Sequence, residues 1–182
     1  MPLSLPDIET LFLRHGNSQY SGEPVTQLEH ALQTALLAEQ AGADDELVTA
    51  ALLHDLGHLL AEHGETPTLR GIDDLHQYIA VPFLRGVFGN RVIDAVQWHV
   101  DAKRYLCATR PGYLEALSPD SQRSLALQGG VFSPEQAEAF MQRPHAADAV
   151  ALRLWDDLAK QEALPTSALS HYLARAERCL LV

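Results

Sequence analysis

Apolar residues recur at intervals of three and four along most of the chain, which is the spacing of amphipathic helices. The strict alternation that marks a half-buried strand never persists beyond a few residues. We therefore expect an all-α protein, a helical bundle in which residues 1–182 form a single domain. The pattern predicts helices over residues 8–16, 29–41, 45–60, 76–88, 90–100, 119–128 and 144–160, another from 134, and a last one over 166–180.

Capping and breaking residues separate these segments. Asp44 or Asp45 is suited to cap the helix that follows it, and Asp73 the helix that begins at His76. Pro82 lies inside a predicted helix and should kink or break it. Irregular backbone is expected over residues 17–27, 62–74 and 101–118, the last containing the turn sequence Arg110-Pro111-Gly112.

Composition and charge limit the partners. The net charge of −11 makes nucleic acid and anionic membranes improbable partners, although a local field can still attract a small anionic substrate. The two cysteines, Cys107 and Cys179, form no paired motif and favour a reducing compartment. We see no signal peptide, and no apolar run approaches the ~20 residues that span a bilayer. These features predict a cytoplasmic protein, and they leave its oligomeric state open.

The pair His54-Asp55 lies within the apolar stretch LVTAALLHDLGHLL. A carboxylate beside an imidazole is costly to bury there unless a partner such as a metal ion compensates its charge. Further histidines and a late aspartate lie in or beside other predicted helices, giving enough ligands for two metal ions. The candidate ligands are His30, His54, Asp55, His76, His99 and Asp156.

The types of ligand limit which metal ions would suit the site. Imidazole and carboxylate without cysteine suit iron, manganese or zinc, and contain too much nitrogen for magnesium or calcium. Asp55 is the candidate bridge, because one carboxylate can bind two cations. Of the pair Asp156-Asp157, we place Asp156 on the metal and Asp157 outside it.

The pattern H…HD…H…H…D resembles the HD-domain superfamily of metal-binding helical bundles, and the resemblance spans nearly the whole chain. His30, His54, Asp55 and Asp156 match the four-ligand core of that superfamily. His76 and His99 match the additional pair that distinguishes its dinuclear members.

Five segments are similar to a small branch of HD-domain oxygenases that cleave the carbon–phosphorus bond of hydroxylated aminophosphonates. The segments are YSGEPVTQLEHALQTA, HDLGHLL, WHVDAKRYL, LSPDSQRSLALQGG and RLWDDLAK. The resemblance implies two iron ions, as an Fe(II)/Fe(III) pair, and O2 as co-substrate. It also implies that 1-hydroxy-2-aminoethylphosphonate is converted to glycine and phosphate, or its trimethylammonio analogue to glycine betaine. The implied substrate-binding residues are Tyr20, Glu23, His58, Lys103, Ser121 and Arg153, of which Tyr20, Glu23, His58 and Lys103 are also candidate catalytic residues.

Specific roles come with this resemblance. It implies that Tyr20 occupies an iron position at rest and leaves when substrate arrives, and that Glu23 meets the substrate amine. The residues also suit a phosphonate in their own right. Lys103 carries a localised positive charge and Arg153 a planar guanidinium, and both could bind phosphonate oxygens. His58 and Ser121 could donate further hydrogen bonds to these oxygens. Arg153 lies three residues before Asp156, and we expect Lys103 in the loop after the helix of His99.

Two rival functions are weighed against the oxygenase. A metal-dependent HD phosphohydrolase would not need Tyr20 and should act without O2. A non-catalytic metal-binding module would be expected to lack ligands or to carry a partner domain. The ligand set here is complete, so an oxygenase is the favoured interpretation. The choice between a primary ammonium and a trimethylammonium group depends on the volume of the pocket and its aromatic walls, and stays open.

Overall fold

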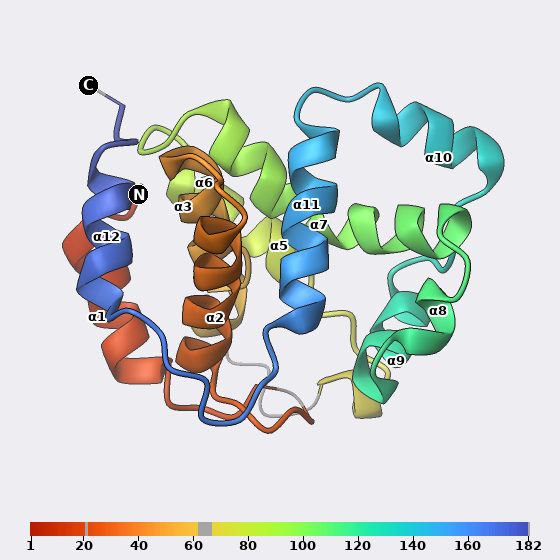
Figure 1. Ribbon diagram of the computed structural model, residues 1–182, viewed down its shortest axis with the longest axis horizontal. Helices are drawn as coiled ribbons and strands as arrows, with labels where there is room; N and C mark the ends of the chain where they lie inside the picture. The colour runs from red at the N-terminus through yellow and green to blue at the C-terminus, as the bar shows by residue number, and fades with distance from the viewer. Residues whose placement is uncertain (21, 62–66, 182) are drawn as a thin grey trace.

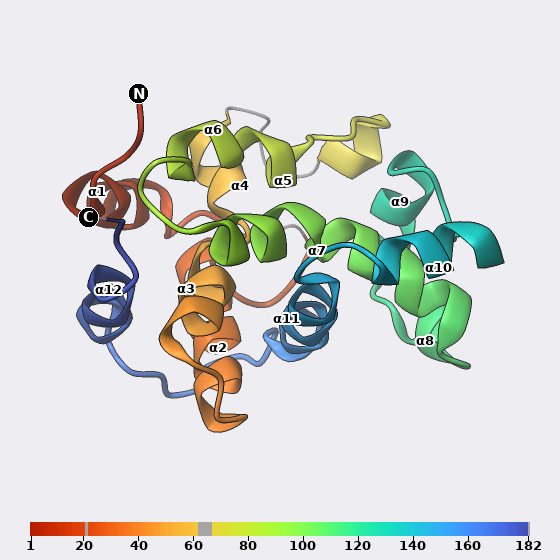
Figure 2. The same ribbon diagram turned by 90° about the horizontal axis from the view of Figure 1, so that it is seen from above.

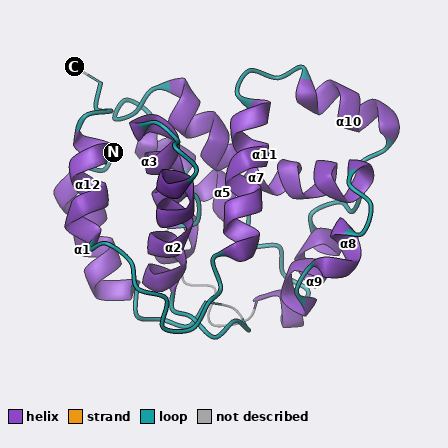
Figure 3. Ribbon diagram, in the orientation of Figure 1, coloured by secondary structure: helices purple, strands orange, loops and turns teal. Residues whose placement is uncertain are grey.

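The computed structural model describes residues 1–20, 22–61 and 67–181. Its regular elements are all helices, which confirms the predicted all-α class, and no strand occurs among the described residues (Figure 3). None of these helices combines the length and apolarity that a membrane crossing requires. The elements are α1 (Leu5–His15), α2 (Gln27–Gln40), α3 (Asp45–Leu53), α4 (Leu56–Leu60), the 3-10 helix η1 (Pro67–Arg70), α5 (His76–Ile79), α6 (Val81–Leu84), α7 (Asn90–Thr109), α8 (Tyr113–Ala116), α9 (Pro119–Leu127), α10 (Pro134–Met141), α11 (Ala146–Leu158) and α12 (Leu169–Glu177).

The longest helix, α7, runs through the middle of the molecule. It packs against α3 and α11 on one side and against α5 and α6 on another, as the view from above shows (Figure 2). Helices α2 and α3 lie side by side, with α12 against α3, while α8, α9 and α10 gather at the far end of α7 (Figure 1). A side chain on the middle turns of α7 can therefore meet residues from several other helices.

Helix α2 begins at a capping box. The hydroxyl of Thr26 accepts the backbone N–H of Glu29, and the Glu29 carboxylate accepts the N–H of Thr26 at 2.7 Å. This reciprocal pair satisfies donors that a helix start otherwise leaves free. It fixes the first turn of α2, so His30 comes directly after a rigid helix start.

The helix predicted over residues 45–60 is interrupted. Helix α3 ends at Leu53 and α4 begins at Leu56, with Asp55 turned out of helical geometry at φ −101° and ψ 14°. Asp44 caps α3 by accepting the N–H of Leu47, as expected. The apolar pattern gave no sign of this break, because no glycine or proline lies at it. The break separates the directions in which the His54 and Asp55 side chains point.

The segment predicted as a helix over 76–88 forms two short helices, α5 and α6, that meet at Ala80, with Pro82 in the first turn of α6. Leu75 precedes α5 in the left-handed region, at φ 53°. The expected cap Asp73 accepts the N–H of Leu75 instead, while Asp74 accepts that of His76. Within the predicted loop 62–74, residues 67–70 form η1, and residues 62–66 lie outside the described residues.

The prediction that residues 101–118 are irregular is wrong for residues 101–109, which continue α7, and for 113–116, which form α8. Helix α7 continues to Thr109 and stops where Pro111 and Gly112, at φ 77°, prevent further helix. Basic and polar residues in WHVDAKRYL interrupt the apolar periodicity, although Ala102, Lys103 and Leu106 are buried. Lys103 therefore lies on the same helix as His99, one turn later, and not in a following loop.

Gly57 provides a test of how α4 is held against α5. A methyl group on Gly57 would overlap the backbone carbonyl of His76, which cannot move without displacing α5. We expect Gly57→Ala to lower the free energy of unfolding by about 3 kcal/mol, the upper range for overpacking. Thermal and denaturant unfolding would measure this loss. Gly89→Ala is the matched control, since a methyl group there meets only ordinary contact distances; an equal loss in both variants would contradict the interpretation.

Candidate metal centre

The six predicted metal ligands come together at the centre of the bundle. His30 is on α2, His54 and Asp55 are in the turn between α3 and α4, and the remaining ligands are on three further elements: His76 on α5, His99 on α7 and Asp156 on α11. Each of the six residues is at most 7% exposed. Their ligand atoms form two groups, His30 with His54 and Asp156, and Asp55 with His76 and His99.

Hydrogen bonds on the outer side of each ring orient the four imidazoles. The Nδ1 atoms of His30, His54 and His99 lie 2.7–2.9 Å from the backbone carbonyls of Ala159, Ala51 and Val96. A carbonyl can only accept, so each Nδ1 must carry the proton. In the neutral ring Nε2 then presents a lone pair to the centre, the arrangement of metal-binding histidines.

The inner nitrogens face one another in pairs. The Nε2 atoms of His30 and His54 are 3.1 Å apart, and those of His76 and His99 are 3.0 Å apart. Two lone pairs at this distance repel unless a proton or a cation lies between them. A cation beside each pair would remove both repulsions.

The carboxylates complete the two groups. Oδ2 of Asp55 lies 3.5 Å from Nε2 of His30 and 3.3 Å from Nε2 of His54. Its Oδ1 lies 3.3 Å from Nε2 of His76 and 3.5 Å from Nε2 of His99. Oδ2 of Asp55 and Oδ1 of Asp156 are buried without a hydrogen-bond donor among the described residues. Such oxygens are costly unless a cation binds them. The donor set therefore fits two metal ions with Asp55 between them, as a mixed imidazole and carboxylate site.

Charge interactions in the cluster agree with this arrangement. Burial alone would raise the pKa of Asp55, but His54, His58 and His30 hold it well below its usual value. For His30, burial opposes protonation, yet the facing carboxylates of Asp156 and Asp55 favour the protonated ring and raise its pKa to about 9 without a metal. A metal ion bound there takes the place of that proton, since only the unprotonated imidazole nitrogen is a ligand.

Asp74 is a site residue that the sequence analysis missed. Its Oδ1 accepts the Nδ1 proton of His76 at 2.7 Å, and its Oδ2 lies 3.1 Å from Nδ1 of His58. The rings of His58 and His76 are stacked, with centroids 4.1 Å apart. An aspartate two residues before a candidate ligand was the available signal, because a carboxylate often orients a metal-binding histidine.

A small cavity of about 50 Å³ opens beside the metal ligands. Tyr20, His58, Lys103, Ser121 and Arg153 line it, so the structure brings together all but one of the predicted substrate residues. Glu23 is the exception, because it is not among the described residues that line the cavity.

Tyr20 lies flat against a metal ligand. Its ring is stacked on that of His30, with centroids 3.9 Å apart and planes inclined by 13°. Burial, followed by the negative charges of Asp55 and Asp156, raises the pKa of its hydroxyl well above the usual value. Without a metal the phenol therefore keeps its proton, and it closes the His30 side of the cavity.

Two buried cations line the same cavity. Lys103 donates to the hydroxyl of Ser124 at 2.7 Å, and burial followed by the nearby charge of Arg153 lowers its pKa to about 7. Arg153 donates to Asp156 Oδ2 at 2.9 Å and to Tyr113, so it joins a metal ligand to the cavity wall. Ser124, which the sequence analysis also missed, lies three residues after Ser121, on the same side of α9.

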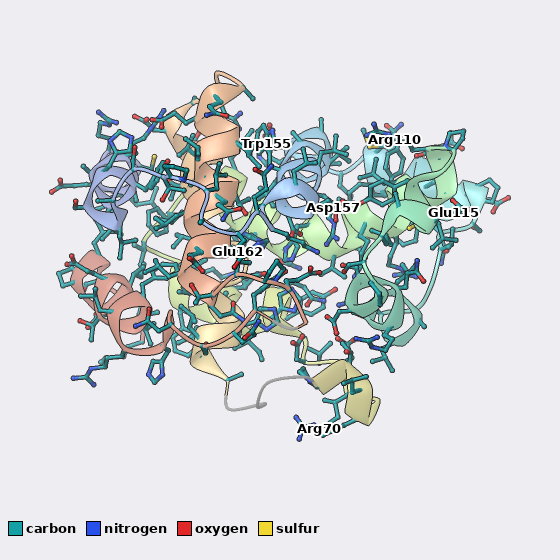
Figure 4. The ribbon with its side chains drawn as sticks, turned by 60° about the horizontal axis from the view of Figure 1, so that its bottom comes forward. Arg70, Arg110, Glu115, Trp155, Asp157 and Glu162 are labelled. Atoms are coloured by element: carbon teal, nitrogen blue, oxygen red, sulfur yellow. The ribbon has the colours of Figure 1, made fainter. Side chains whose placement is uncertain are left out.

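Asp157 is not part of either ligand group. It bonds to Arg153 and to the hydroxyl of Tyr113 at the side of α11 that faces α8 (Figure 4). Asp156 and Asp157, which are neighbours in the sequence, thus bind different nitrogens of the Arg153 guanidinium.

Comparison with known proteins places this geometry in a family. Residues 28–159 match the HD domain. A hydroxymethylphosphonate dioxygenase of Gimesia maris is 45% identical, over 91% of this chain and 83% of its own length. A glycine-betaine-forming [1-hydroxy-2-(trimethylamino)ethyl]phosphonate dioxygenase of Leisingera caerulea is 39% identical, over 92% of this chain and 86% of its own length. An uncharacterized protein of Acanthamoeba polyphaga mimivirus, L432, is 34% identical, over 91% of this chain and 76% of its own length.

Metal content tests the two ligand groups. We expect the iron-loaded protein to hold two ions per chain, and His76→Ala to keep only the ion of the His30 group. Asp55→Asn should weaken both sites, because the amide loses the charge that serves both groups. Metal analysis after dialysis, with thermal unfolding as a second measurement, would show this. His15→Ala alters an exposed histidine and should keep both ions; equal retention in Asp55→Asn would argue against a shared carboxylate.

Proposed function

The chain belongs to the HD-domain phosphonate dioxygenases, and we propose that it cleaves the carbon–phosphorus bond of a 1-hydroxyalkylphosphonate with O2. The products are a carboxylic acid and inorganic phosphate, and both atoms of O2 are retained in them. One observation carries this proposal. Two groups of candidate metal ligands, both contacted by the Asp55 carboxylate, adjoin a cavity that the buried side chains of Lys103 and Arg153 also line.

Two iron ions are the proposed cofactor: His30, His54 and Asp156 would hold one and His76 and His99 the other, and the Asp55 carboxylate would contribute to both groups. When bound, they would supply O2 activation and an anchor for the substrate's oxygens. The protein's own contribution is to orient the substrate and to keep water away from it.

The phosphonate is proposed to lie between Lys103 and Arg153. Lys103 can turn its ammonium from Ser124 toward an anion, and Arg153 offers a fixed planar donor. Ser121 and His58 line the same cavity and add further hydrogen-bond donors. Since Arg153 also holds Asp156, the anion would be kept at a set distance from the metal ligands, which is the positioning the reaction needs.

Tyr20 is proposed to control access. Stacked on His30, it occupies the space beside the first ligand group until a substrate displaces it. Tyr20 belongs to a loop with internal hydrogen bonds. The N–H of Tyr20 donates to the carbonyl of Val25, and the N–H of Glu23 donates to the carbonyl of Tyr20. A loop can change its conformation while the helix that follows it stays fixed, so displacement of Tyr20 would not require α2 to move.

The finer assignment of the substrate rests on the resemblance given above. It proposes 2-amino-1-hydroxyethylphosphonate as substrate and glycine as product, with Glu23 accepting the amine. The trimethylammonio analogue, giving glycine betaine, is the alternative with the same charge.

Dependence on oxygen is the first test. We expect iron-loaded protein supplied with ascorbate to release phosphate from hydroxymethylphosphonate or one of the two ammonium compounds in air but not under nitrogen. Phosphate would be measured colorimetrically and oxygen uptake with an electrode, with one O2 consumed per phosphate. Cleavage of a nucleotide monophosphate under nitrogen, with no phosphonate turnover, would instead identify an HD phosphohydrolase.

The pH profile tests Lys103. Because its pKa in the free protein is about 7, Lys103 carries a charge below that pH and loses it above. We expect kcat/KM for a phosphonate to fall as the pH rises through this value, since kcat/KM reports the free enzyme. Lys103→Arg should remove the decline, because its guanidinium stays charged. Lys103→Met should lower kcat/KM by about 100-fold below pH 7 and by progressively less above it, where the wild type loses the same charge. An unchanged decline in Lys103→Arg would contradict this assignment.

A further inference from the structure

Each nitrogen of the Arg153 guanidinium has a partner within the protein. Nη1 donates to Oδ2 of Asp156 at 2.9 Å, and Nε donates to the hydroxyl of Tyr113 at 3.2 Å. Nη2 donates to Oδ1 of Asp157. A guanidinium has five N–H groups in one plane, so these bonds fix the orientation of the plane and leave two N–H groups for another acceptor.

Tyr113 and Asp157 are also bonded to each other. The hydroxyl of Tyr113 donates to Oδ2 of Asp157, while Oδ1 of the same carboxylate accepts from Arg153. Burial raises the pKa of the Tyr113 hydroxyl, so the phenol keeps the proton that it donates. The three side chains therefore form a closed ring of hydrogen bonds, and each bond includes a charged group, which strengthens it.

The ring joins two parts of the fold. Arg153 and Asp157 lie four residues apart on α11, a spacing that places two side chains on one face of a helix. Tyr113 comes from α8, and its backbone N–H donates to the carbonyl of Arg110, where α7 ends. The ring therefore links the helix of Arg153 to the turn that follows the helix of Lys103.

Tyr113 and Asp157 lie behind Arg153 as seen from the cavity. Arg153 lines the cavity beside the candidate metal ligands, but neither Tyr113 nor Asp157 is among the described residues that do so. Both instead line a separate groove between α8 and α11. Neither side chain can therefore touch a substrate in the cavity, and Arg153 is the group that connects them to it.

Without these two partners, the guanidinium would be left with Asp156. Arg153 precedes Asp156 by three residues, close enough for both oxygens of that carboxylate to accept from it. Oδ1 of Asp156 lies 3.3 Å from Nε2 of His30 and has no hydrogen-bond donor among the described residues. Since arginine and carboxylate groups favour two parallel hydrogen bonds, an unheld guanidinium would turn toward this oxygen and away from the cavity.

We propose that Tyr113 and Asp157 are positioning residues, which hold the guanidinium of Arg153 in the orientation that binds the phosphonate group of the substrate. This inference rests on the proposed function and extends it to residues that do not contact the substrate. The expected effect is on affinity, because a guanidinium that is not held must be ordered when the substrate binds, and that ordering weakens binding.

Tyr113→Phe is the first test, because it removes the hydroxyl and keeps the ring. We expect KM to rise about tenfold for the phosphonate that the wild type cleaves best among the three named above, with less than about a twofold change in kcat. The dissociation constant of the same compound, measured under nitrogen, should rise by the same factor. Asp157→Asn should act similarly, since the amide nitrogen that replaces one oxygen cannot accept a hydrogen bond.

Two variants control for indirect effects, and the iron content of every variant is measured in parallel. Asp148→Asn breaks a different ion pair of α11, the one with Arg91 at the start of the helix, and should lower stability without changing KM. Tyr105→Phe removes a phenol hydroxyl from a ring that packs against Phe140 in a groove away from the cavity, and it should leave both constants unchanged.

A double change separates positioning from a general structural role. In the Arg153→Met background, Tyr113→Phe should raise the dissociation constant less than about twofold, because its effect depends on the guanidinium. Unchanged constants in Tyr113→Phe, a loss confined to kcat, an equal rise in both backgrounds, or a rise matched by loss of iron would overturn the inference. Failure of the wild type to release phosphate from any of the phosphonates would instead contradict the proposed function.

Discussion

The structure depends on the burial of negative charge and lone pairs at one point in the bundle. Asp55 and Asp156 are nearly inaccessible to solvent, and four imidazoles direct Nε2 toward them. Such a centre would destabilise an apolar core unless cations balance it. Arg153 supplies part of that balance by bonding to Asp156, and bound metal would supply the rest. A buried carboxylate without a cation is costly, so we expect metal binding to stabilise the folded protein.

Local departures from regular helix occur where the ligands lie. The chain leaves helical geometry at Asp55, and Leu75 adopts a left-handed conformation immediately before His76. The left-handed conformation is unfavourable for a residue with a side chain such as Leu75, and it persists only where the surroundings hold it. The close approach of Gly57 to the His76 carbonyl fixes one turn against the other. These irregular backbone segments therefore direct the side chains of Asp55 and His76 toward the centre of the bundle.

The helical class and the six residues that cluster at the centre of the bundle could be predicted because both leave local signals. Periodicity marks a helix, and a histidine-aspartate pair in an apolar run requires compensation. The breaks at His54-Asp55 and Ala80 and the length of α7 could not be predicted, because long-range packing decides them. The same reason hid Tyr113 as a partner of Arg153. The two residues lie 40 positions apart in the sequence, and no local pattern relates them.

The end of α11 connects three functions that would otherwise be separate. Within a few residues it provides a metal ligand, Asp156, the carbonyl that orients His30, and the ammonium that holds Glu23 beside Tyr20. A substrate that moves Tyr20 must therefore act against a segment that also shapes the metal centre. The position of Tyr20 and the geometry of the candidate metal centre are therefore connected through one short segment of the chain.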